Sequence, residues 1–266
     1  MAESYLERFS REPGFPTEVH ERAAESLVDY VVGVAGVQAA LLTCSCARGV
    51  AAPESCVDIT LLVDPDDRER FMRHDWPGVL AHIESDPACV ALDKSVPWSG
   101  IDIDFHDGIF APGHHGWTTG ADAYELEIGN ALAWSHPLFM RGSRYRLLQE
   151  HYLPYYDNAL RQERLIMVVG YATNNIEHIV PYARRGLYGQ AFKRLYHALE
   201  ETLQALFISR GVYPIAYDKW LREQLVDILG EPGLYTEWID ILATPEFSVK
   251  QFADRSARLA ALLETL

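Results

Sequence analysis

The sequence predicts an α+β fold in which a small mixed-sheet domain is followed by an all-α helical bundle. Apolar runs at residues 37–43 and 57–63 flank a segment that contains Gly and Pro, and residues 101–105 alternate apolar and acidic side chains. These patterns are typical of strands. Beyond residue 121, apolar residues recur three and four positions apart, as in packed helices. We therefore expect a mixed α/β domain over residues 1–125 and a helical domain over residues 126–266.

The first half begins with a predicted helix over residues 18–32, for which Thr17 is the expected N-cap. The two apolar runs follow as strand, turn and strand. After them the patterns predict, in order, a charged helix or loop at 64–73, a short strand at 88–92, and the strand with an acidic face at 101–105.

The second half consists of long helical patterns. Leu195, Leu199 and Leu203 belong to an apolar stripe on the segment 188–209, and Gly211 and Pro214 are expected to end that helix. The predicted helices are 122–133, 142–156, 158–183, 188–209, 217–229 and 247–263.

Two short segments carry the strongest indication of chemistry. Residues 44–49 read Cys-Ser-Cys-Ala-Arg-Gly, and residues 55–59 read Ser-Cys-Val-Asp-Ile. A hydroxyl residue in a Gly-containing turn at a strand end can present backbone N–H groups to a phosphate, and an acid on the next strand can hold a divalent cation. The pattern indicates nucleotide handling.

The two segments resemble the Gly-Ser-x-Ala-Arg-Gly and Ser-Asp-x-Asp motifs of the polymerase-β-like nucleotidyltransferases, and the spacing between them fits without a gap. The resemblance implies transfer of a nucleoside monophosphate from a nucleoside triphosphate, the NTP substrate, to a small acceptor, with Mg²⁺ held by carboxylates. Residue by residue, Ser45, Arg48 and Gly49 match the nucleotide-binding positions, and Asp58 matches the second metal-binding Asp.

Two residues depart from the motif. Cys44 replaces its Gly, and Cys56 replaces the first metal-binding Asp. Because Mg²⁺ prefers hard oxygen ligands, a thiol at position 56 weakens the expected metal site. The alternative hypothesis is therefore a catalytically impaired pseudoenzyme that binds a nucleotide or a protein partner. A second alignment, with Asp58 as the first acid and Thr60 at the second position, needs two extra loop residues and loses the match of Ser55.

The third acid of the implied metal site is expected on the strand at 101–105. The alternation places Asp102 and Asp104 on one face, opposite Ile101, Ile103 and Phe105. The resemblance implies that one of the two acids is a metal ligand and catalytic residue, and the sequence does not distinguish between them. The alternative is an exposed edge strand whose acids prevent pairing with other chains.

The helical half resembles the C-terminal domains of nucleotidyltransferases of the kanamycin-nucleotidyltransferase type, on the residues at 185–186, 206–209, 213–214 and 219–221. In such enzymes this domain helps to form the acceptor pocket. Glu125 and Glu127 are candidates for the general base, and His114 and His115 lie in a Gly-rich loop that is a candidate cover for the site. For both pairs the alternative is an ordinary exposed surface, on which Glu and His are common.

Charge and composition limit the partners. The chain of 266 residues has 38 acidic residues against 23 Lys and Arg, a net charge of −15, which disfavours large nucleic acids. No signal segment and no membrane span is evident, so we expect a cytoplasmic protein. Trp220 and Trp238 fit a homodimer interface as well as a core.

The four cysteines are too few for a secreted disulfide scaffold. Three of them lie in the two motif segments. Small buried thiols are the simplest interpretation, and a zinc-thiolate site or a disulfide between Cys44 and Cys56 are the alternatives.

Overall fold

The structure is a computed structural model that describes residues 12–97, 100–109, 130–153, 158–215 and 219–266. These residues form two compact units, one made of the described residues up to 109 together with Asn130–Leu153 and the other of those from 158 to 266. None of the helices within these ranges is long and apolar enough to cross a lipid bilayer.

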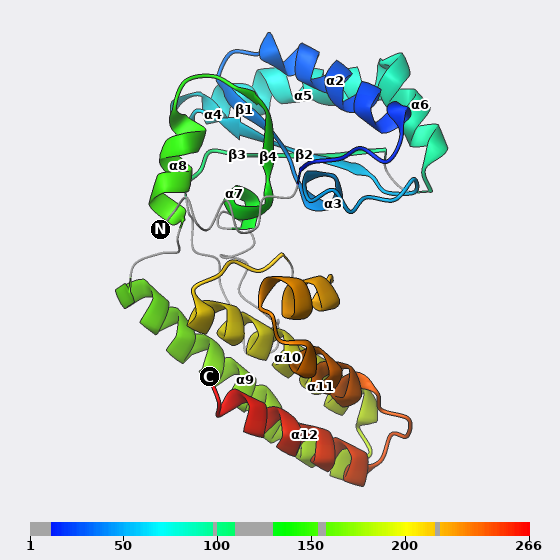
Figure 1. Cartoon of the computed structure of the whole chain (residues 1–266), viewed down its shortest axis with the longest axis vertical. Helices are drawn as coiled ribbons and strands as arrows, with labels where there is room; N and C mark the ends of the chain where they lie inside the picture. Colours follow the sequence, from blue (N-terminus) through cyan, green and yellow to red (C-terminus); the bar gives the residue numbers. More distant parts are fainter. Residues whose placement is uncertain (1–11, 98–99, 110–129, 154–157, 216–218) are drawn as a thin grey trace. The chain divides into compact units, whose positions relative to one another are not determined.

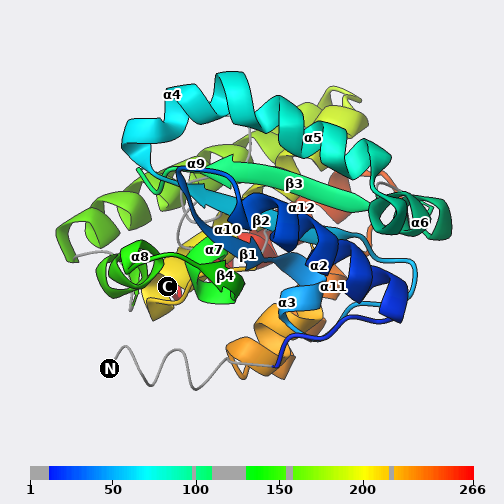
Figure 2. The ribbon, with the colours of Figure 1, turned by 90° about the horizontal axis from the view of Figure 1, so that it is seen from above.

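The first unit contains a four-stranded mixed sheet (Figure 1). Its strands are β1 (Val37–Leu42), β2 (Val57–Val63), β3 (Ile101–His106) and β4 (His136–Met140), in the order β3-β2-β1-β4. β1 is antiparallel to β2 and to β4, whereas β2 and β3 are parallel. Figure 2 shows β3 and β4 at opposite edges of the sheet. Three of the four strands that the sequence predicted, at 37–43, 57–63 and 101–105, are confirmed.

β4 is a strand that the sequence analysis missed. It is short and contains Pro137, which pairs with Leu41 of β1. Proline cannot donate a ladder hydrogen bond, so it is tolerated on an edge strand, which needs donors on one side only. Because β4 joins the sheet, residues Asn130–Leu153 pack in the first unit, beyond the boundary expected at residue 125, and they include α7 (Asn130–Trp134) and α8 (Arg144–Tyr152).

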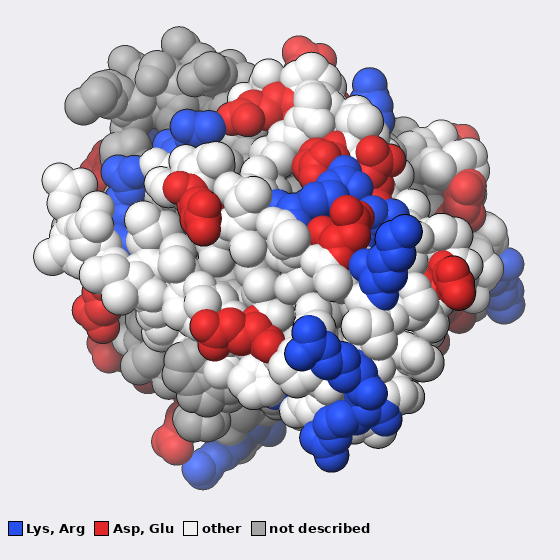
Figure 3. All heavy atoms as spheres, turned by 90° about the horizontal axis from the view of Figure 1, so that it is seen from below, with Lys and Arg blue, Asp and Glu red and all other residues white. Residues whose placement is uncertain are grey.

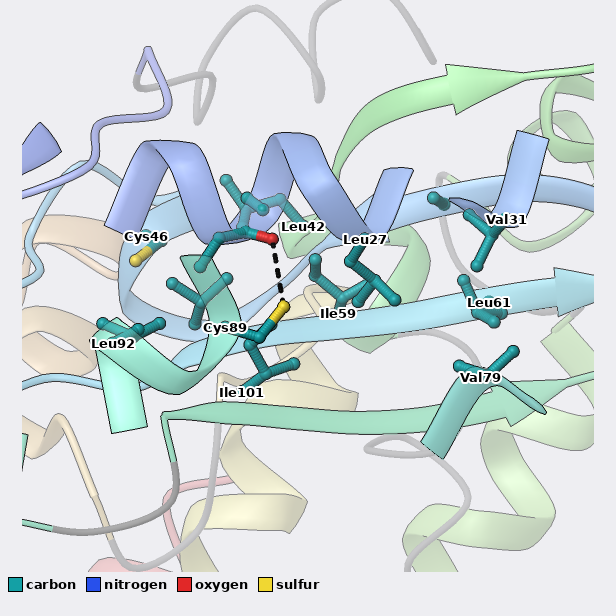
Figure 4. Packing of buried hydrophobic residues seen from close by; sticks show 14 of the residues in the cluster. Leu27, Val31, Leu42, Cys46, Ile59, Leu61, Val79, Cys89, Leu92 and Ile101 are labelled. Carbon is teal, nitrogen blue, oxygen red and sulfur yellow. Dashed lines mark hydrogen bonds between the residues drawn. The ribbon is translucent and has the colours of Figure 1, made fainter. Parts of the chain in front are cut away.

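Helices α2 (Glu18–Val32), α5 (Trp76–Ser85) and α6 (Pro87–Ser95) cover one face of the sheet (Figure 1). A short 3₁₀ turn, Pro65–Asp67, precedes α4 (Arg68–Arg70), which continues through a π-helical turn, Phe71–Asp75, into α5. The core lies between these helices and the sheet (Figure 4), and its members include Leu27, Leu42, Ile59, Leu61, Val79 and Leu92.

The predicted strand at 88–92 is wrong, because this segment lies inside α6. The side chain of Asp86 accepts hydrogen bonds from the backbone N–H groups of Ala88 at 2.9 Å and Cys89 at 3.1 Å, and Pro87 occupies the first helical position. An Asp N-cap followed by Pro is a strong helix-start signal. The short apolar run gave no indication of this.

The second unit is entirely helical in its described residues. Its elements are α9 (Asn158–Arg184), α10 (Tyr188–Arg210), a π-helical segment (Glu223–Ile228), α11 (Pro232–Leu242) and α12 (Val249–Leu263). The predicted stop of α10 is confirmed, because Gly211 adopts a left-handed conformation with φ of +64°. Trp238 is buried in the helical core, whereas 40% of Trp220 is exposed. The α+β fold class with a helical second half is therefore confirmed.

Candidate functional site

The register between β2 and β3 brings two acids together. Asp58 is the direct partner of Asp102, and both lie on parallel neighbouring strands. Val57 and Ile59 point into the helix-covered core, so Asp58 between them points to the opposite face of the sheet. Neighbouring strands are about 4.8 Å apart, which places the two carboxylates side by side.

Asp104 occupies a different position on the same face. Its register partner is Thr60, and its carboxylate lies 3.8 Å from Nε2 of His106, with 61% of the side chain exposed. The sequence did not distinguish Asp102 from Asp104 as the third acid, and in the structure the two residues have different neighbours. Asp102 faces an acid, and Asp104 faces a hydroxyl residue.

Cys56 lies two residues before Asp58, immediately before β2. Its thiol donates to the Asp58 carboxylate, with Sγ 3.3 Å from Oδ2 and 3.5 Å from Oδ1. Burial, followed by the charge of Asp58, raises the pKa of the Cys56 thiol to about 11. Cys56 is therefore a neutral hydrogen-bond donor at neutral pH, where the motif of the resembled family has a carboxylate.

The turn that follows β1 is hydrogen-bonded to the backbone of Asp58. The backbone N–H of Thr43 donates to the carbonyl of Asp58 at 2.9 Å, and the short helix α3 (Cys44–Ala47) begins at the next residue. Cys44 has a φ of +52°, in the left-handed region that favours glycine. This conformation explains why a glycine suits position 44 and why Cys44 carries backbone strain.

Arg48 supports this turn from inside the protein. Only 4% of its surface is exposed, and its Nη1 donates to the Cys44 carbonyl at 2.8 Å. The expected contact of Arg48 with a nucleotide stays a prediction, whereas its hydrogen bond to Cys44 holds the turn itself.

Ser45 and Gly49 are each in close contact with the backbone of another residue. Ser45 is 7% exposed, and its carbonyl accepts a hydrogen bond from the backbone of Val50 at 3.0 Å. Gly49 has a φ of +66°, and a Cβ at this position would lie 2.6 Å from the carbonyl oxygen of Glu12. Gly49 is thus required by backbone conformation and by the close approach of residue 12. The expected phosphate contact of Ser45 stays a prediction.

The charge of Asp58 also acts on the other two cysteines of the motif segments. Burial, and then the charge of Asp58, raises the pKa of the buried Cys46 thiol to about 12. Desolvation of the sulfur and the same charge raise the pKa of Cys44 to about 12, although the residue as a whole is exposed. All four cysteines are free thiols, so no disulfide links Cys44 to Cys56. At neutral pH the negative charge of this group resides on the carboxylates.

His20 is a positioning residue that the sequence analysis missed. Its Nε2 lies 2.9 Å from the carbonyl oxygen of Ser55, which can only accept, so Nε2 is the protonated nitrogen. In the neutral ring Nδ1 then accepts from the hydroxyl of Thr17 at 2.7 Å. Thr17 occupies the predicted N-cap position of α2, but its side chain binds His20 instead of the helix backbone. The only signal of this role in the sequence is a His three positions after Thr17, at the start of the predicted helix.

The remaining candidates, His114, His115, Glu125 and Glu127, lie outside the described residues.

No family model matches the chain, and no curated protein matches it. Among solved structures, it is similar to a nucleotidyltransferase-like protein from Exiguobacterium sibiricum, with 13% identity over 93% of this chain and 75% of that chain, and a TM-score of 0.44. A similarity this low assigns neither a family nor a function to the chain.

Proposed function

We propose that this chain is a polymerase-β-like nucleotidyltransferase that transfers a nucleoside monophosphate from an NTP to a small acceptor. The observation that supports the proposal is the register pairing of Asp58 with Asp102 on the sheet face opposite the helical layer. This places two carboxylates beside the turn that carries the Ser45 motif, because Thr43 is hydrogen-bonded to Asp58. On this proposal Asp102 is the third acid and Asp104 is not.

The donor set fits one divalent cation better than two. Mg²⁺ is commonly bound by one or two carboxylates together with waters and substrate phosphates, which Asp58 and Asp102 can provide. A second ion would need a further carboxylate, and position 56 instead holds a neutral thiol that donates to Asp58. We therefore propose that Asp58 and Asp102 hold one Mg²⁺ that arrives with the NTP.

The chain's own residues would position the triphosphate. A bound Mg²⁺ would neutralise phosphate charge and orient the leaving pyrophosphate. Arg48 holds the Cys44 carbonyl, and the close contact of Gly49 with Glu12 holds the end of the turn, so the segment from Thr43 to Gly49 is kept beside Asp58. His20 holds the other segment through Ser55.

A small acceptor is proposed because of the charge of the chain. A net charge of −15 repels nucleic-acid phosphates. Figure 3 shows one group of basic side chains interleaved with acidic ones and a second group of basic side chains that lies apart from it, so the basic side chains on this face do not form one continuous patch of the kind that binds nucleic acid. We also propose that the helical half is a C-terminal domain of the kanamycin-nucleotidyltransferase type.

The test is a calorimetric titration of the reduced full-length chain with nonhydrolysable ATP and GTP analogues, with Mg²⁺, with Mn²⁺ and without metal. Metal-dependent binding is expected. Binding that is identical with and without metal would contradict the role of Asp58 and Asp102. No binding under any condition would favour the pseudoenzyme alternative with a protein partner.

A further inference from the structure

A second group of metal-ligating side chains lies in the helical layer of the first unit. His82, Asp86 and Cys89 each offer one ligand atom, and these atoms all lie within 4.8 Å of one another. They lie on α5, on α6 and at the corner between these helices, which cover the sheet face opposite to Asp58. The group is therefore separate from the proposed nucleotide site.

The corner between the two helices brings the three residues together. Asp86 follows the last residue of α5 and is the N-cap of α6, and its N–H donates to the carbonyl of His82 at 2.8 Å. His82 is thus one turn before the corner, and Cys89 is in the first turn after it. The spacing His-x₃-Asp-x₂-Cys places all three side chains on the same side of the corner.

Each of the three side chains is held by a further contact. Oδ1 of Asp86 accepts the N–H groups of Ala88 and Cys89, and the ring of His82 stacks on Tyr30 with a centroid distance of 4.5 Å. Cys89 is 2% exposed, and its thiol lies 3.9 Å from the carbonyl oxygen of Ala23 (Figure 4). Contacts of this kind orient metal ligands before the ion arrives.

One polar side chain of α2 points into the group. Oγ of Ser26 lies 3.1 Å from Nε2 of His82. Burial of Asp86 opposes its ionisation, but hydrogen bonds from Cys89, Ser26 and Ala88 together lower its pKa, so it is a carboxylate at neutral pH. An N-cap alone requires neither an imidazole nor a thiol beside it. Together the three groups are the ligand types of a borderline-soft divalent ion.

We propose that His82 Nε2, the Asp86 carboxylate and Cys89 Sγ form a binding site for Zn²⁺ or a similar borderline-soft divalent ion. A water molecule or the Ser26 hydroxyl would complete a tetrahedral set. Binding replaces the S–H bond of Cys89 by a metal–sulfur bond and releases one proton to solvent.

The test uses the reduced full-length chain after treatment with a chelator. Zn²⁺ is titrated in competition with a chromophoric chelator in the presence of excess Mg²⁺, and Co²⁺ is bound in a parallel sample to record its spectrum. We expect one ion per chain and a near-ultraviolet sulfur-to-Co²⁺ charge-transfer band. Cys89→Ser should abolish that band and weaken Zn²⁺ binding by at least about tenfold.

Matched variants make the assignment specific. Cys46→Ser replaces an equally buried cysteine of the same core and should leave the Co²⁺ spectrum unchanged. His82→Gln should weaken Zn²⁺ binding, whereas His74→Gln, at an exposed histidine, should not. Circular dichroism shows whether Cys89→Ser folds. If it does not, the comparison of His82→Gln with His74→Gln tests the site instead, because His82 is only half-buried.

Two results would overturn the proposal. One is the absence of stoichiometric Zn²⁺ binding by the chelator-treated wild-type chain. The other is a Zn²⁺ affinity and a Co²⁺–sulfur band that survive in Cys89→Ser and disappear in Cys56→Ser, which would place the ion beside Asp58.

Discussion

The thiol of Cys56 donates a hydrogen bond to the carboxylate of Asp58, with Sγ 3.3 Å from Oδ2. A donor at this position occupies carboxylate lone pairs that a cation would otherwise use. The protein thus has a hydrogen bond where the resembled motif has a second acid. This hydrogen bond, the register of β3 beside it and the turn after β1 lead to four predictions.

Replacing Cys56 by Asp should strengthen Mg²⁺-dependent binding of an NTP analogue by about tenfold or more, equivalent to about 1.4 kcal/mol. The new carboxylate would add a hard oxygen ligand beside Asp58 and Asp102. Without metal the same variant should be less stable, on the order of 1 kcal/mol, because like charges then face one another. Calorimetry and thermal melting with and without Mg²⁺ measure both effects. Cys56→Asn is the uncharged control, and equal affinities for the two variants would count against the proposed site.

Asp102→Asn should lower metal-dependent nucleotide affinity by about tenfold or more, whereas Asp104→Asn should change it by less than about twofold. The difference is expected because Asp102 is the register partner of Asp58 and Asp104 is the partner of Thr60. The two substitutions are chemically identical and lie on the same face of β3, so each controls for the other. A larger loss in Asp104→Asn would reverse the assignment of the third acid.

The protein should lose stability as the pH rises from about 9 to about 11. Burial and the charge of Asp58 raise the pKa of Cys56 from 9.0 to about 11, and burial with the charge of Asp86 does the same for Cys89. The folded state therefore holds these protons more tightly than the unfolded state. Their contribution to the free energy of unfolding is fully present below pH 9 and is lost as the pH passes through the folded pKa.

Urea denaturation between about pH 8 and pH 11 measures this loss. Cys56→Ser should show a smaller decline than the wild type, because the titrating thiol is absent. A decline of the same size in both proteins would show that Cys56 does not contribute to it.

Gly49→Ala should destabilise the first unit more than Gly142→Ala. Both glycines have positive φ angles, +66° and +71°, so each substitution should cost about 1–2 kcal/mol from backbone conformation. At Gly49 the new Cβ would also lie 2.6 Å from the carbonyl of Glu12, whereas at Gly142 nothing lies within 4 Å. Denaturant unfolding of the two variants gives the difference. Equal losses would mean that residue 12 does not pack against Gly49 in solution.

Much of the fold could be predicted because it depends on local pattern. The β-branched and apolar residues of Val57–Val63, the alternation in Ile101–His106 and the apolar stripe of Tyr188–Arg210 all lie within single elements. Side-chain periodicity in one element is a property of its own residues. The same is true of Gly211, whose left-handed conformation ends α10 as expected.

Two of the exceptions, β4 and the choice of the third acid, depended on contacts between segments that are distant in the chain, whereas the third, the helix at 88–92, follows from a local cap that the prediction did not use. β4 is a strand because β1 offers it an open edge, and residues 88–92 are helical because Asp86 caps α6, although their apolar run also suited a strand. The choice between Asp102 and Asp104 depends on the parallel register of β3 against β2. Periodicity places both acids on one face but does not set their position along a neighbouring strand, because that register is a long-range property of the folded sheet.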